Sequence, residues 1–298
     1  MKKSAFMWVV AGALTLTSCG SVPLTGRSQL NLVSDSQVLQ SGLSAYTSFM
    51  QSATVSSDKV QSDQVTRVGK RIAAATEKYL TENGLAAEVK NYSWEFNLVK
   101  DDQVNAFCMP GGKIVVYEGL MKLVNSDDDL AVVLGHEVAH AVAKHSNERL
   151  SQQMLAQYGG QAMGMILQNK SYQTQAIAQK VYGLGANYAV ILPFSRKHES
   201  EADYIGLALM SLAGYNPDNA VGFWQKMSAN GSSKVPEFMS THPSDSKRIS
   251  DIQKNLPTIK QKFYTAAVTT TTTKSATTTS TKSAKASQKK TTSKSKKK

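Results

Sequence analysis

Two histidines four residues apart, His136 and His140 in the segment HEVAH, are the residues of this 298-residue sequence best spaced to bind one metal ion. Four residues of α-helix turn about 400°, so both imidazoles project from one face, one turn apart, which suits zinc. Glu137 lies about 100° from His136, where a carboxylate can act as general base without binding the metal. The alternative, two surface histidines spaced by chance, is disfavoured by the intervening glutamate and the apolar neighbours.

Such a zinc site needs a third protein ligand, and the nearby residues do not supply one. A histidine six residues after His140 would serve, but that position is Ser146. His145 lies about 140° round the helix from His140, so it should face away from the metal. The spacing predicts that His145 is a surface residue, or one that lies behind the ligands.

A later segment, His198 to Asp203 (HESEAD), offers the missing ligand. In thermolysin-like sites a glutamate from a later helix binds the metal, and an aspartate follows four residues on. Glu199 and Asp203 have this spacing, whereas Glu201 lies about 200° from Glu199, on the far side of the helix. Either glutamate alone could be a solvated charge, but HEVAH would then lack a third ligand, so we predict Glu199. By similarity to thermolysin-like enzymes, Asp203 accepts a hydrogen bond from His136 and orients that ring.

The elements that must position these residues are mainly helical. A helix that carries HEVAH is expected to begin after Ser126, which can cap it, and to run from Leu130 to about Leu155. The other expected helices span residues 35–53, 58–83, 195–213 and 217–229. Alternating or apolar runs predict short strands at residues 92–98, 104–108 and 113–117. The sequence therefore predicts an α+β fold, mainly helical, with a small β-sheet beside the HEVAH helix.

Further segments carry a resemblance to a known family. They are Asn105-Ala106-Phe107 followed by PGG at 110–112, Phe194-Ser195-Arg196, AGYNP at 213–217, and Thr241-His242-Pro243 with Arg248-Ile249. With HEVAH and ESEAD, they resemble the metallopeptidases that include CAAX prenyl proteases, the heat-shock protease HtpX and mitochondrial Oma-type proteases (peptidase family M48). The resemblance covers roughly residues 22–255. It implies a minigluzincin-like domain, one Zn²⁺ per chain and hydrolysis of peptide bonds in proteins.

The resemblance also implies roles for residues outside the metal motifs. The strand at Asn105, Ala106 and Phe107 would bind substrate by backbone pairing, although sequence alone favours a plain strand and turn. His242 would either stabilise the oxyanion that forms during attack or occupy the fourth zinc position and keep the enzyme latent. The alternative is an ordinary loop histidine. The branch of the family that this chain resembles favours the gating role.

The N-terminus predicts export and lipidation. Lys2 and Lys3 precede an uncharged apolar stretch, Ala5 to Thr17, and Leu16-Thr17-Ser18-Cys19 resembles a bacterial lipobox. Cys19 would be acylated, whereas an ordinary secretory signal with an incidental cysteine is the alternative. PLTGR at 23–27 resembles the periplasmic lipoprotein branch of the family, of the LoiP and BepA type. We expect a bacterial cell-envelope protein that is lipid-anchored, faces the periplasm and is placed at the outer membrane.

Four regions are therefore expected: a lipoprotein signal peptide at 1–18, a lipidated tether at 19–34, the zinc metallopeptidase domain at 35–264, and a disordered tail at 265–298. The tail explains the net charge of +12, because nine of the 34 basic residues lie in 274–298 and two are Lys2 and Lys3. The remaining 23 basic residues face 22 acidic ones, which disfavours nucleic-acid binding by the domain. The tail could contact anionic envelope polymer or lipid.

The resemblance implies unassembled or damaged envelope proteins as substrates. The rival function is a lipid-anchored, zinc-stabilised chaperone or assembly factor that holds clients without cutting them, and such a protein would not need Glu137. The remaining cysteine, Cys108, lies in the apolar run AFCM and is expected to pack in the core.

Overall fold

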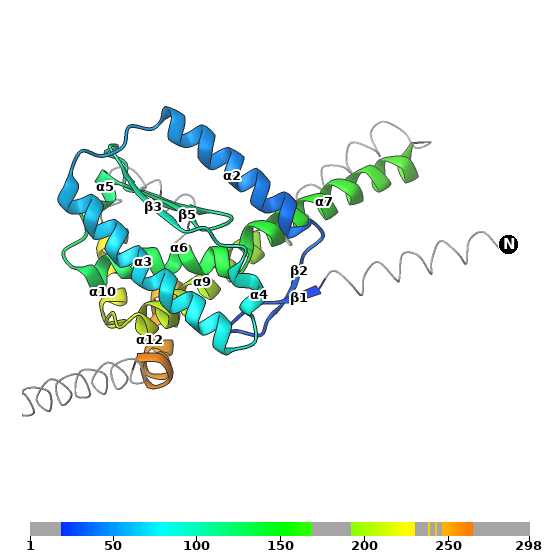
Figure 1. The fold of residues 1–298 in the computed structure, drawn as a ribbon. Coiled ribbons are helices and arrows are strands. Elements are labelled where there is room, and N and C mark those ends of the chain that lie inside the picture. The colour runs from blue at the N-terminus through cyan, green and yellow to red at the C-terminus, as the bar shows by residue number, and fades with distance from the viewer. Residues whose placement is uncertain (1–18, 169–191, 230–237, 239–241, 243–245, 265–298) are drawn as a thin grey trace, which may run out of the picture.

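The computed structural model describes residues 19–168, 192–229, 238, 242 and 246–264 (Figure 1). The expected signal peptide 1–18, the tail 265–298 and the residues on either side of His242 lie outside the described residues. Among the described helices, none combines the length and the apolar composition needed to span a bilayer.

The described chain is mainly helical with a small mixed sheet, which confirms the predicted fold class. Its helices are α2 (Asp35–Ser52), α3 (Lys59–Glu82), α4 (Ala86–Val89), α5 (Glu118–Met121), α6 (Asp127–Val142), α7 (His145–Leu167), α9 (Leu192–Leu212), α10 (Asn219–Ala229), α12 (Ser246–Ile259) and the π-helical turn η2 (Lys260–Tyr264). Its strands are β1 (Cys19–Ser21), β2 (Ser28–Leu30), β3 (Glu95–Val99), β4 (Ala106–Met109) and β5 (Lys113–Tyr117).

The larger sheet has three strands in the order β3-β5-β4. The central strand β5 pairs in parallel with β3 and antiparallel with β4, so β4 is an edge strand of this sheet. Because successive strand residues point to opposite faces, Ile114 and Val116 join the main core, while Val115 and Tyr117 pack toward α2. Figure 1 shows this arrangement, with α2 on one side of the sheet and α3 and α6 on the other.

Helix α6 is held against α9 by an unusually close crossing. A Cβ atom at Gly135 would lie 2.8 Å from the carbonyl oxygen of Gly206, a separation that real Cβ atoms do not tolerate. Only glycine at both positions lets the two backbones approach this closely. The crossing sets His136 of α6 opposite the turn of α9 that carries Glu199 and Asp203. The start of α6 is as predicted: Oγ of Ser126 accepts a hydrogen bond from the Asp129 N–H at 3.1 Å.

The helix predicted from Leu130 to about Leu155 is in fact two helices. α6 ends at Val142, and Lys144 adopts a left-handed backbone conformation with φ of 51° before α7 begins at His145. Left-handed residues interrupt a right-handed helix and turn the chain. The angular count from His140 to His145 assumed one continuous helix, so it does not hold here.

The segment predicted as a tether at 19–34 also differs from expectation. β1 and β2 form an antiparallel hairpin that pairs Cys19 with Leu30, and the Val22 side chain between them is 1% exposed within the main core. The hairpin is thus packed on the domain.

Candidate metal centre

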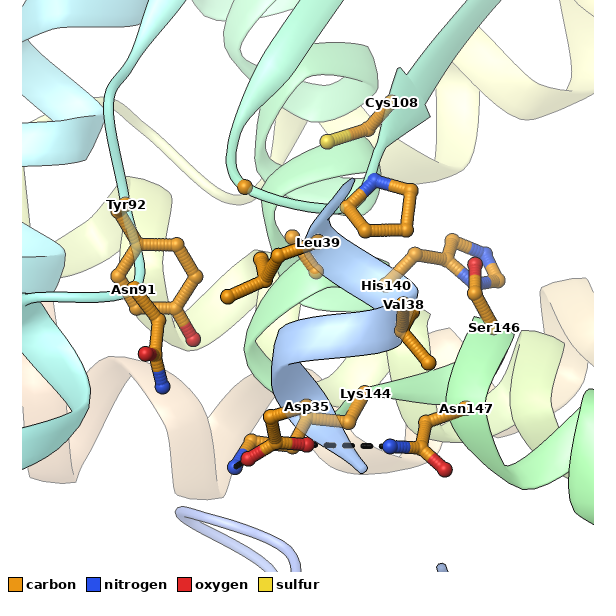
Figure 2. Close-up of a pocket in the computed structure, with 13 residues that line it drawn as sticks. Asp35, Val38, Leu39, Asn91, Tyr92, Cys108, His140, Lys144, Ser146 and Asn147 are labelled. Carbon is orange, nitrogen blue, oxygen red and sulfur yellow. Dashed lines mark hydrogen bonds and ion pairs between the residues drawn. The ribbon is translucent and has the colours of Figure 1, made fainter. Parts of the chain in front are cut away.

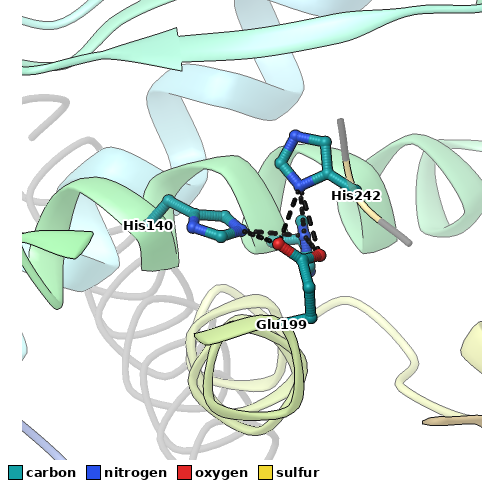
Figure 3. A group of neighbouring side chains, drawn as sticks. His140, Glu199 and His242 are labelled. Carbon is teal, nitrogen blue, oxygen red and sulfur yellow. Dashed lines mark hydrogen bonds and ion pairs between the residues drawn. The ribbon is translucent and has the colours of Figure 1, made fainter. Parts of the chain in front are cut away.

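Four side-chain donor atoms, from α6, α9 and the segment at His242, converge on one point (Figure 3). Nε2 of His136 lies 3.1 Å from Nε2 of His140 and 3.2 Å from Nδ1 of His242. The Glu199 carboxylate lies 3.2 Å from His136, 3.4 Å from His140 and 3.2 Å from His242. The structure therefore brings the three predicted ligands together and places His242 beside them.

These separations fit a zinc ion. Four ligands at about 2.0–2.1 Å in a tetrahedron lie about 3.3 Å from one another. The five separations given above are 3.1 to 3.4 Å, and all four donor atoms lie within 4.8 Å of one another. Hydrogen bonding alone does not explain them, because Nε2 of His136 carries one hydrogen or one lone pair but meets three polar atoms within 3.2 Å. Imidazole and carboxylate are donors that zinc prefers, so this group of residues would hold one Zn²⁺.

The charge states of the ligands suit a cation. Burial acts to raise the pKa of Glu199, but the neighbouring imidazoles lower it well below its usual value. Burial also lowers the pKa of His140 well below its usual value, so this ring is neutral. For His136, burial and the Arg248 guanidinium act to lower the pKa, yet Asp203 and Glu199 outweigh them and raise it to about 9. A metal ion must therefore displace a proton from His136.

Asp203 lies where the sequence predicts, behind His136. Its Oδ1 atom is 3.0 Å from Nδ1 of His136, which leaves Nε2 directed at the other donors. The buried Arg248 guanidinium donates to the same carboxylate oxygen at 2.8 Å, and it lies 4.2 Å from the Trp224 ring centroid. Arg248 entered the sequence analysis only as part of the resemblance, and the structure makes it the partner that keeps Asp203 ionised and in place.

Glu137 lies next to the metal ligands and is 1% exposed. Burial raises its pKa, and the Cys108 backbone N–H donates to its carboxylate. Its Oε1 atom has no hydrogen-bond partner among the described residues, and it lies 3.7 Å from Nε2 of His242. A buried carboxylate with an open oxygen and a raised pKa is suited to accept and return a proton near neutral pH.

The predicted substrate strand, β4, passes beside this carboxylate. The Tyr117 N–H donates to the Asn105 carbonyl, so by antiparallel alternation Ala106 and Cys108 direct their backbone groups to the opposite, outer edge. The Cys108 N–H on that edge reaches Glu137. The Ala106 side chain is buried in the main core, and Phe107 packs edge-on against Phe49 of α2, so what this strand presents at its edge is backbone.

An apolar cavity of about 40 Å³ lies between α2, the β4–β5 turn and His140 (Figure 2). Side chains that line it include Val38, Leu39, Tyr92, Cys108 and Pro110. Asp35 closes the rim through bonds to Lys144 at 2.7 Å and Asn147 at 3.0 Å. Cys108 is half-buried and burial raises the pKa of its thiol well above the usual value, consistent with the expected packing role.

The structure contradicts the prediction that His145 faces away from the metal and lies at the surface, and it confirms the alternative, a residue that lies behind the ligands. Because the chain turns at Lys144, this ring is 2% exposed and its Nδ1 atom lies 2.9 Å from Nδ1 of His140. Burial lowers the pKa of His145 to about 4, so it is neutral. Glu201, placed on the far side of the helix from Glu199, does point elsewhere, but it is buried and lies 3.1 Å from Nε2 of His145. Proximity in sequence to HEVAH was the available signal for His145.

Comparison with known proteins agrees with this geometry. The chain is 38% identical over 200 residues to the mitochondrial metalloendopeptidase OMA1 of Schizosaccharomyces pombe, a match that covers 66% of this chain and 54% of that protein. It is 30% identical over 248 residues to human OMA1, a match that covers 79% of this chain and 45% of that protein. It is 25% identical over 240 residues to the β-barrel assembly-enhancing protease of Escherichia coli, a match that covers 78% of this chain and 47% of that protein. The chain spans about half the length of these curated relatives.

A family model described as peptidase family M48 matches residues 61–256, which include all four converging donors, Glu137 and Asp203. This chain therefore belongs to peptidase family M48.

Proposed function

We propose that this chain is a zinc-dependent endopeptidase that cleaves unassembled or damaged cell-envelope proteins from a lipid anchor at Cys19. The observation that carries the catalytic part is the convergence of His136, His140 and Glu199 beside the buried carboxylate of Glu137. Relatives named as metalloendopeptidases support it.

The residues divide the chemistry among them. A bound zinc ion would supply Lewis acidity, which lowers the pKa of a water molecule to about 7 and polarises the scissile carbonyl. Glu137 would take a proton from the attacking water as the water oxygen bonds to the carbon of the scissile carbonyl. As the carbon–nitrogen bond breaks, Glu137 returns the proton to the departing amine. Asp203 and Arg248 hold His136 in place throughout.

Substrate would bind as an added strand along β4. The outward carbonyls of Ala106 and Cys108 would accept hydrogen bonds from an extended peptide, which places its backbone beside Glu137. Backbone recognition suits a protease that acts on many unfolded clients. The cavity beside His140 could then take an apolar side chain of the bound peptide.

His242 would keep the enzyme latent. Its Nδ1 atom lies 3.2 Å from Nε2 of His136 and 3.2 Å from the Glu199 carboxylate, so it would take the place of a water beside a bound metal. Its ring stacks on Phe238 at 4.5 Å. Activity would require this ring to move away. His242→Ala should then raise basal cleavage of an unfolded protein with zinc still bound. A fall of roughly 100-fold in kcat at unchanged KM would instead assign the oxyanion role to His242.

The envelope location rests on the N-terminal pattern, and one relative is named for β-barrel assembly. Two experiments test it. Cys19→Ala should abolish labelling by a radioactive fatty acid and release the protein from membranes, and unchanged labelling would refute the anchor. Proteomics of envelope fractions should show clients that accumulate in a Glu137→Gln strain. If client proteins are equally abundant in the wild-type and the Glu137→Gln strains, the chaperone that holds clients without cutting them is the better account.

A further inference from the structure

A second buried polar cluster lies behind the metal centre. We call it the Arg27 cluster, and its members are Arg27, His145, Glu148, His198 and Glu201. The N-terminal hairpin supplies its cation: Nη2 of Arg27 lies 2.7 Å from both Glu148 and Glu201. Oγ1 of Thr25, in the same loop, donates to Glu201 at 2.6 Å. Residues more than 170 positions apart in sequence are thus bonded inside the domain.

The cluster meets the metal centre where His145 approaches His140. Nε2 of His140 is the atom that faces the other metal donors, so its Nδ1 atom carries the hydrogen. That N–H can donate to Nδ1 of His145, 2.9 Å away. His145 then carries its own hydrogen on Nε2 and donates to Glu201 at 3.1 Å. One assignment of hydrogens satisfies every bond in this chain.

We propose that Thr25, Arg27, Glu201 and His145, which we call the His145 relay, orient the metal ligand His140. The proposal rests on the proposed function only in that His140 binds the metal. His136 is oriented directly by a carboxylate, Asp203, whereas His140 is oriented by a carboxylate that acts through a second imidazole. Such partners fix the tautomer and direction of a ligand ring and strengthen metal binding.

The relay connects the N-terminal hairpin to the metal ligand His140 through Glu201 and His145. The Glu201 carboxylate can accept from His145 only while its position is fixed, and Thr25 and Arg27 fix it by donating to the same carboxylate. The hairpin itself is anchored by the buried Val22 side chain. Loss of the loop contacts should therefore weaken metal binding although no residue of the hairpin approaches the metal donors.

The test is zinc affinity of the full chain, measured by competition with a chelator. His145→Leu removes the acceptor for His140 and should weaken zinc binding about 10- to 100-fold. His145→Asn keeps an acceptor at the position of Nδ1 and should recover part of this loss.

His198→Leu is the matched control, because His198 is equally buried and stacks on His145 at 4.4 Å but bonds to Glu148. It should lower the melting temperature similarly and leave zinc affinity within about threefold. Equal affinities of His145→Leu and wild type, or equal losses for His198→Leu and His145→Leu, would overturn the relay.

A double-mutant cycle tests the hairpin. Thr25→Val preserves side-chain volume and should weaken zinc binding a few fold by itself, and add nothing in the His145→Leu background. Losses that multiply in the double variant would show that Thr25 acts independently of His145 and would remove the hairpin from the relay. These readouts need no peptide substrate. Absence of proteolysis in both the zinc-loaded wild type and the zinc-loaded His242→Ala protein would refute the proposed function and leave the relay standing.

Discussion

The metal centre and the Arg27 cluster are built from the same residue types but end in different states. Each contains buried histidines and glutamates contributed by α9 and by the helices on either side of Lys144. In the Arg27 cluster each carboxylate is saturated by donors: Glu148 accepts from Arg27, Gln29 and His198, and Glu201 accepts from Arg27, Thr25 and His145.

The metal centre lacks that compensation. Glu137, Glu199 and Asp203 face a single described guanidinium, that of Arg248, and the four ligand atoms converge on one point with too few hydrogens to satisfy every close contact. A divalent cation would neutralise the excess charge and accept all four lone pairs. Histidine and glutamate are present in both clusters, so they do not distinguish a metal site from a structural cluster. The difference lies in the fixed cations and hydrogen-bond donors that surround the carboxylates.

The largest expected difference between the two clusters concerns Glu199 and Glu201, two residues apart on α9. Glu199→Gln removes an anionic ligand and should weaken zinc binding on the order of 1,000-fold. Glu201→Gln keeps acceptor capacity behind His145 and should cost no more than about tenfold, with one zinc ion still bound at saturation. Chelator competition on both variants measures this, and the reverse ranking would exchange the roles assigned to the two glutamates.

The second largest effect should be on stability. Arg27→Met leaves Glu148 and Glu201 buried without their shared cation, and breaking a buried pair costs about 3 kcal/mol. Urea unfolding of the metal-free protein measures the loss. Lys59→Met, which breaks an exposed pair with Asp63, is the control and should change the free energy of unfolding by less than about 1 kcal/mol. Equal effects would mean that the Arg27 cluster is not a structural ion network.

The metal centre should show its own proton linkage. Because the pKa of His136 is raised to about 9 in the metal-free protein, zinc binding must release that proton at lower pH. Zinc affinity should rise about tenfold per pH unit between pH 7 and 9 and level off above. Calorimetry in buffers of different ionisation enthalpy counts the released protons, and release of none at pH 7.5 would contradict the raised pKa.

The smallest expected effect is the acid sensitivity of the Arg27 cluster. Burial acts to raise the pKa of Glu201, but bonds from His145, Arg27 and Thr25 lower it to about 2, against 4.5 unfolded. Its stabilisation is therefore complete above about pH 4.5 and is lost as pH falls toward 2. The melting temperature of the metal-free wild type should fall over this range more steeply than that of Glu201→Gln. Parallel curves would show that Glu201 carries no such linkage.

Much of the metal centre could be predicted from spacing alone, because its ligands lie on regular helices. His136 and His140, one turn apart, and Glu199 and Asp203, one turn apart, project as helical geometry requires. Strands β3, β4 and β5 and most helices also lie within a few residues of their predicted positions, since their apolar periodicity is regular.

The residues missed by sequence reasoning depend on irregular backbone or on long-range contacts. His145 faces inward because Lys144 is left-handed, and no local pattern indicates that a lysine adopts this conformation. Arg27 reaches Glu201 across 174 positions, and its segment has the composition of a tether. Arg248 was visible only as a resemblance, because its partner Asp203 lies 45 residues away.

The central claim is that Glu137 performs proton transfer at a zinc site that it does not help to hold. The most direct measurement is cleavage of an unfolded protein by the zinc-loaded His242→Ala protein and by the same protein with Glu137→Gln, with zinc content measured in both. The account predicts one zinc ion per chain in each and cleavage only where Glu137 is present, with a loss of at least about 1,000-fold. Cleavage by the Glu137→Gln protein at a comparable rate, with zinc bound, would contradict it.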